Sequence, residues 1–176
     1  FLILAFPLAV IVPFSAYRSL AAEQEDNTYE LLSISLLTPR QIIAGKLASA
    51  LVQMMVYLSA VAPCLAFTYL LRGIDILSIG VLLFYTFFGS LGLSMIGLLV
   101  ATATREKFGQ VILSVGLIVG LVWCFGLAAA GATEFLGWSH QYVDDWEFWV
   151  ANGAMLTAYG TYFAMAFLGA AAQLTF

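Results

Sequence analysis

The chain has 176 residues, of which 63% are hydrophobic and 9% are charged, and its formal net charge is −4. A soluble domain averages about half apolar and about a quarter charged residues, so this composition indicates a membrane protein. The acidic excess argues against a nucleic-acid partner, because such a partner is held mainly by Lys and Arg.

Long runs without charge set the predicted architecture. A helix needs about 20 apolar residues to cross a bilayer core of roughly 30 Å. The runs are continuously apolar, whereas the strands of a β-barrel alternate in hydrophobicity. We therefore expect an all-α, polytopic membrane helix bundle, one permease-like transmembrane domain, with five spans over residues 1–17, 47–71, 76–104, 108–132 and 148–173.

The first run is short for a span. A secretory signal peptide is the alternative for residues 1–17, but the run has no basic segment before its apolar part. Pro7 and Pro13 suit a packed span as well as a signal peptide. We interpret residues 1–17 as a span, and expect the domain to begin before residue 1.

The distribution of basic residues predicts the orientation. Loops on the cytoplasmic side carry the excess of Lys and Arg. The first link (18–46) and the third (105–107) carry most of them, the second carries one, and the outer loop 133–147 carries none. We predict a multi-pass protein of the cell (inner) membrane, with 18–46 and 105–107 in the cytoplasm and 133–147 outside. The basic residues are Arg18, Arg40 and Lys46 in the first link, Arg72 in the second, and Arg105 and Lys107 in the third.

The first link holds a predicted short helix over residues 28–37. Asn27 is a good N-cap with Glu30 at the third helical position, and the acidic residues before it favour the positive end of a helix. The helix is apolar around most of its circumference, which is typical of a buried helix. It either lies under the base of the bundle at the interface or is clamped against a soluble partner, and the residues alone favour neither.

A second helix is predicted to begin at Pro39. Thr38 at the cap, Pro39 at the first helical position and Gln41 at the third form a capping box with a proline already set in helical geometry. Because a residue before proline avoids the helical region, the preceding helix must end before this corner. We expect the second helix to continue through Lys46 into the span 47–71, with Arg40 and Lys46 at the inner headgroups.

This link resembles the loop between the second and third spans of type 2 (ABC-2) ABC transporter permeases. In that family, acidic residues precede Leu-Glu-Leu-Leu, a Thr-Pro turn, and then Ile and Gly-Lys. The stretch 98–110, LLVATATREKFGQ, is similar to the family's short cytoplasmic turn after the fourth span. This chain departs from the pattern at Asn27 and Tyr29, where the family has Gly and Leu. The matching residues are Glu23, Glu25, Glu30-Leu31-Leu32, Thr38-Pro39-Arg40, Ile42-Ile43 and Gly45-Lys46.

The resemblance implies a permease subunit, of an exporter, with six spans in the full domain. The short helix would be the coupling helix, received by a separate ABC ATP-binding subunit, and a second permease copy or paralogue would complete the transporter. No cofactor is expected on this chain, with ATP and Mg²⁺ on the partner ATPase. Gly45-Lys46 is not a P-loop, because Arg40 and Leu47 stand where that motif needs Gly and Ser or Thr. The implied coupling contacts are Glu23, Glu25, Glu30, Leu31, Leu32, Ile34, Thr38, Pro39, Arg40 and Lys46.

Small residues in the third and fourth spans are candidates for close helix packing. We favour packing inside one chain over a dimer seam for each of them. They are Gly89, Gly97, Ala101, Gly116 and Gly120.

A transporter is not the only function class open to such a chain. The alternative is a membrane scaffold or assembly protein without transport, or an intramembrane enzyme. The spans contain no acidic or basic residue, and the chain has no Cys/His cluster, so we expect neither catalysis nor a metal site.

Overall fold

The computed structural model describes residues 5–25, 38–72, 76–103, 107–142 and 146–173, and within them every regular element is helical. The all-α prediction is therefore confirmed for this part of the chain. The predicted short helix over 28–37 lies outside the described residues. The elements are the π-helix η1 (Pro7–Ile11) and the α-helices α2 (Val12–Glu25), α4 (Pro39–Arg72), α5 (Ile76–Thr102), α6 (Lys107–Tyr142) and α7 (Trp146–Gln173).

In the part of the chain that the structure describes, four helices are long and apolar enough to cross a membrane, by their length and composition. These are α4, α5, α6 and α7, whose candidate spans cover Pro39–Cys64, Ile79–Thr102, Phe108–Glu134 and Trp146–Gln173. The helix over the first apolar run is not among the four. The membrane-protein class indicated by composition thus agrees with the helices that form.

Two helices extend beyond the apolar runs that predicted them. Helix α2 continues to Glu25 instead of ending at residue 17, and α6 continues to Tyr142, well into the predicted outer loop 133–147. The reason is that an apolar run marks the part of a helix at hydrocarbon depth. Because a helix satisfies its own backbone hydrogen bonds, it can continue from the hydrocarbon region into water without losing any of them.

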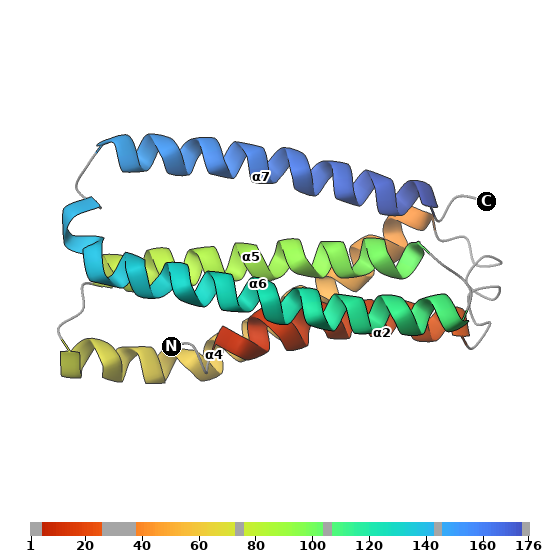
Figure 1. The fold of residues 1–176 in the computed structure, drawn as a ribbon, viewed down its shortest axis with the longest axis horizontal. Helices are drawn as coiled ribbons and strands as arrows, with labels where there is room; N and C mark the ends of the chain where they lie inside the picture. The colour runs from red at the N-terminus through yellow and green to blue at the C-terminus, as the bar shows by residue number, and fades with distance from the viewer. Residues whose placement is uncertain (1–4, 26–37, 73–75, 104–106, 143–145, 174–176) are drawn as a thin grey trace.

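The helices form an elongated bundle, and successive long helices run in opposite directions along it (Figure 1). Helices α2, α6 and α7 pack against α5, while α4 crosses the bundle obliquely. The end of α2, the start of α4, the end of α5 and the start of α6 all lie at one end of the molecule. We call this end the α2–α4 end. The helix ends that flank both links predicted to be cytoplasmic therefore lie at the same end of the bundle.

The core lies toward the α2–α4 end, with α2 in its centre. Val12 and Leu20 of α2 are fully buried, as are Met95 and Leu98 of α5 and Ile43 of α4. Helix α7 adds small residues to the same cluster, and α6 lies at the edge of the bundle. An apolar helix at the edge of a membrane bundle faces lipid, and this accounts for the exposed apolar surface of α6.

A serine on α5 completes the hydrogen bonding of the π-helix. The Val12 N–H bonds the Pro7 carbonyl, five residues back, and so is not available to Leu8. The next N–H that could reach the Leu8 carbonyl is that of residue 13, which is proline and has none. The buried hydroxyl of Ser90 donates to the Leu8 carbonyl instead. The π-helix and α5 are therefore joined by a bond that the local sequence makes necessary.

We expect Ser90→Ala to lower the free energy of unfolding by about 1–2 kcal/mol, because the Leu8 carbonyl then stays buried without a donor. Ser94→Ala is the matched control. Ser94 is equally buried on the same helix, but its hydroxyl donates to the Ser90 carbonyl of its own helix at 2.8 Å. Thermal unfolding in detergent micelles measures both variants. Equal losses for the two serines would contradict this account of the π-helix.

Candidate functional site

One lysine joins α2 and α4, the helices on either side of the predicted short helix over residues 28–37. The Lys46 ammonium on α4 donates to the main-chain carbonyl of Ser19 on α2 at 3.0 Å, and it pairs with the carboxylate of Glu23. The side chains of Lys46 and Glu23 are 20% and 28% exposed. Such a partly exposed pair contributes at most about 1 kcal/mol. Its main consequence is therefore positional, since it holds the end of α2 beside the start of α4.

The sequence predicts that Lys46 and Glu23 both contact a partner, with Lys46 at the inner headgroups. A bond between the two residues does not test those predictions. The structure brings the two together across 23 positions of sequence. A contact between neighbouring helices depends on how each helix is rotated, and the sequence carries little information on that rotation.

The corner at Thr38 and Pro39 has the predicted helix start. The Thr38 carbonyl accepts the main-chain N–H groups of Gln41, at 2.9 Å, and of Ile42, at 3.2 Å. The Gln41 side chain accepts the Thr38 N–H at 2.9 Å, which is one half of a capping box. The prediction that a helix begins at Pro39 is confirmed. Thr38 and Arg40 are exposed, while Ile43, one turn further on, is fully buried and fixes α4 in the core.

The remaining predicted coupling residues cannot be placed. Glu25 is the last residue of α2, and its side chain is not described. Glu30, Leu31, Leu32 and Ile34 lie outside the described residues. The structure thus describes the two ends of the predicted coupling segment and the bond between those ends.

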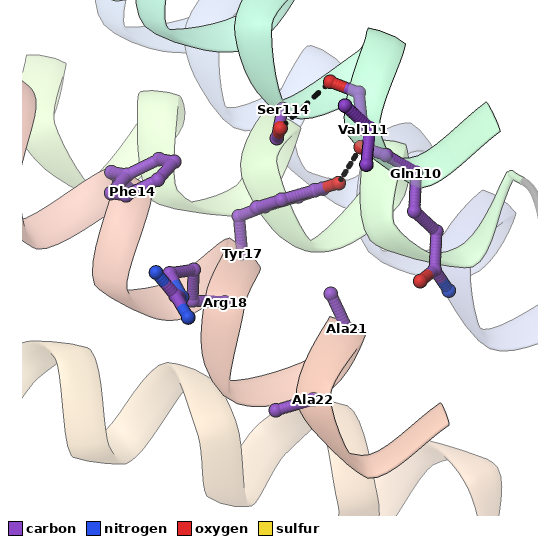
Figure 2. Close-up of a pocket in the computed structure, with 8 residues that line it drawn as sticks. All are labelled: Phe14, Tyr17, Arg18, Ala21, Ala22, Gln110, Val111 and Ser114. Atoms are coloured by element: carbon purple, nitrogen blue, oxygen red, sulfur yellow. Dashed lines mark hydrogen bonds between the residues drawn. The ribbon is translucent and has the colours of Figure 1, made fainter. Parts of the chain in front are cut away.

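A small pocket lies between α2 and α6 at the same end of the bundle (Figure 2). Its volume is about 210 Å³, and the Tyr17 ring crosses it from α2. The Tyr17 hydroxyl donates to the main-chain carbonyl of Gln110 on α6 at 2.9 Å. In Figure 2 the side chains of Arg18 and Gln110 point away from each other on either side of this bond. Arg18 is exposed, so the pocket adds a positive charge to the α2–α4 end.

The pocket and the Lys46 contact show structural residues that the sequence did not single out. Tyr17, Ser19 and Gln110 are polar, and each lies close to the end of an apolar run. A polar residue at that position finds a partner either in the headgroup layer or on a neighbouring helix. Their position in the sequence is the signal for such residues, but it does not identify the partner.

The predicted packing residues fall into two groups. A Cβ added at Gly97 would lie 2.9 Å from the Pro13 carbonyl oxygen, so α5 and α2 approach closely there. Ala101, one turn further along α5, is buried. A Cβ at Gly89, Gly116 or Gly120 would meet no atom within 4 Å. Those three glycines have no close contact within the described chain that requires a glycine.

Among the described residues, no group of three or more His, Cys, Asp and Glu side chains is placed to hold a metal ion. No protein-family model, curated protein or solved structure matches the chain. The site is a junction at which Lys46 bonds α4 to α2, beside the exposed corner at Thr38 and Pro39.

Proposed function

We propose that this chain is the membrane-spanning permease subunit of an ATP-driven ABC transporter of the exporting type. The observation that carries the proposal is the junction at the α2–α4 end. Helix α4 starts at an exposed Thr-Pro corner, and Lys46 fastens it to α2 just beyond the segment that resembles a coupling helix. A subunit that receives force from a partner needs a rigid connection at this place.

The junction suggests how a movement would pass into the membrane. A partner ATPase, which carries the ATP and Mg²⁺, binds the helix over residues 28–37. Pro39 restricts the angle between that helix and α4, and the contacts of Lys46 make α2 move together with α4. Because α2 is packed against α5 at Gly97, the movement reaches the core and is not absorbed by a flexible hinge.

Copurification tests the proposal. The tagged chain is extracted from its native membrane in a mild detergent, and the accompanying chains are identified by mass spectrometry. We expect an ATP-binding subunit with a P-loop and a particle mass that fits two permease chains with two ATPases. A lone monomer without any ATPase would overturn the proposal and favour a membrane scaffold without transport.

The proposal includes an orientation, with 18–46 and 105–107 in the cytoplasm and 133–147 outside. We expect an impermeant maleimide to label Ser139→Cys in intact cells, and to label Ser33→Cys only after the cells are permeabilised. Both variants are made with Cys64→Ser and Cys124→Ser, because the two native thiols are exposed and would react with the maleimide themselves. If Ser33→Cys alone were labelled in intact cells, the proposed orientation would be wrong, and 18–46 would lie outside with 133–147 in the cytoplasm.

A further inference from the structure

A second, larger cavity lies at the end of the bundle away from the α2–α4 end. Its volume is about 620 Å³, within the range of roughly 300–1,000 Å³ that is usual for small-molecule sites. Its walls come from residues 82–93 of α5, 124–132 of α6 and 148–155 of α7, with Ala5 and Ala9 at one side. In Figure 1, helix α7 diverges from α5 and α6 toward this end.

The cavity lies between candidate membrane spans. Its α5, α6 and α7 walls all fall inside the candidate membrane spans Ile79–Thr102, Phe108–Glu134 and Trp146–Gln173. Water is poorly suited to such a place, since a buried water needs two to four polar partners. An occupant must therefore come from the apolar phase around the bundle.

The side chains of this chain do not fill the space. The α6 wall contains Phe125 and then a run of small residues over 128–132, and Gly89 lines the cavity from α5. A Cβ added at Gly89 or at Gly131 would meet no atom within 4 Å. Among the lining residues, Tyr85, Gly89 and Met155 are exposed, so the space is a groove that another molecule can enter from the surroundings of the bundle.

The residues that line the cavity favour an apolar ligand over a polar one. No lining residue carries a charge. The hydroxyl of Ser90 is used by the Leu8 carbonyl, and that of Thr86 donates to the Leu82 carbonyl at 2.8 Å. A polar ligand would lose its hydration here and find few partners in return.

We propose that this cavity is a binding site for one acyl chain of a bilayer lipid, held between α5, α6 and α7. An acyl chain matches the apolar lining, is present in the surrounding bilayer at this depth, and can enter without any polar group being buried. This site is separate from the α2–α4 junction and does not depend on a transport role.

Photolabelling in a defined bilayer tests the site. The intact chain is reconstituted into phosphatidylcholine vesicles that contain a small fraction of phosphatidylcholine with a diazirine on one acyl chain. After irradiation, labelled peptides are mapped by mass spectrometry. We expect labels on the α5 and α7 walls, at residues 82–93 and 148–155, as well as on the lipid-facing surface of α6.

Two glycines of α6 provide a matched pair of variants. Gly131 lines the cavity and Gly126 does not, yet a Cβ at either would meet no atom within 4 Å. Gly131→Phe should fill the space and lower labelling of the α5 and α7 walls roughly fivefold or more. Gly126→Phe should leave it unchanged. Gly89→Leu fills the cavity from the α5 wall. It takes the place of Gly131→Phe in the labelling experiment if Gly131→Phe does not fold.

Two outcomes would overturn the proposal. In the first, the cavity walls are labelled equally in the wild type, in Gly131→Phe and in Gly89→Leu, which means that no chain enters the space. In the second, the walls are protected in the wild type, which means that a second copy of this protein or another protein covers them.

Discussion

Replacing Gly97 with alanine is expected to lower the free energy of unfolding by about 2–3 kcal/mol, because the new methyl group overpacks the seam between α5 and α2. The added Cβ would lie 2.9 Å from the Pro13 carbonyl oxygen. That oxygen belongs to the backbone, so no side chain can rotate out of the way, and the helices themselves must move apart. Thermal unfolding in detergent micelles, followed by tryptophan fluorescence, measures the loss.

Gly89→Ala is the control, since it makes the same change on the same helix. A Cβ at Gly89 meets no atom within 4 Å. Alanine loses less backbone entropy in a helix than glycine, by roughly 0.5–1 kcal/mol, so this variant should be slightly more stable than the wild type. The two substitutions should therefore act in opposite directions. Destabilisation by both would mean that helix packing at Gly97 is not the cause.

The helical fold could be predicted because the membrane leaves a chain few choices. A backbone in hydrocarbon must satisfy its own hydrogen bonds, so a long apolar run without alternation becomes a helix. The runs 47–71, 76–104 and 108–132 each correspond to one helix, namely α4, α5 and α6. The start of α4 could be predicted as well, because capping at Thr38 and the geometry of Pro39 are local effects.

The packing could not be predicted in the same way. In a soluble protein, the apolar face of a helix indicates which side is buried. Helices α5 and α6 are apolar on all sides, so nothing in the sequence distinguishes the side facing lipid from the side facing protein. Gly97 and Gly116 therefore look equivalent in the sequence, although only Gly97 has a close contact with another helix in the described chain.

The candidate site was predictable only in part, for a related reason. The polar segment 18–46 is conspicuous in an apolar chain. Its described parts, the end of α2 and the start of α4, lie at one end of the bundle, as the alternation of the spans predicts. The bond from Lys46 to the Ser19 carbonyl depends on the relative rotation of α2 and α4. The bond from Ser90 to the Leu8 carbonyl depends on a π-helix, which Pro7 and Pro13 favour but do not by themselves determine.

Replacing both Leu31 and Leu32 with aspartate is expected to abolish binding of the partner ATPase. On the proposed function, these leucines fill a groove of that partner, in a contact from which water is excluded. Two carboxylates there would be buried without counter-charges, which should weaken association at least on the order of a hundredfold, or about 3 kcal/mol. Copurification and transport-linked ATP hydrolysis measure the loss. The variant should still insert in the membrane, since both positions lie outside the spans predicted from the sequence, 1–17 and 47–71.

Ser33→Asp is the matched control, because it adds a charge to the same predicted helix and keeps both leucines. Each residue turns an α-helix by about 100°, so Ser33 should point roughly 150° away from the direction midway between Leu31 and Leu32. Partner binding by Ser33→Asp should stay close to that of the wild type. If the double aspartate variant also keeps its ATPase and its full coupled hydrolysis, residues 28–37 are not a coupling helix. They would then lie at the membrane interface as an anchor, and Lys46 would join α2 to α4 without passing on any movement.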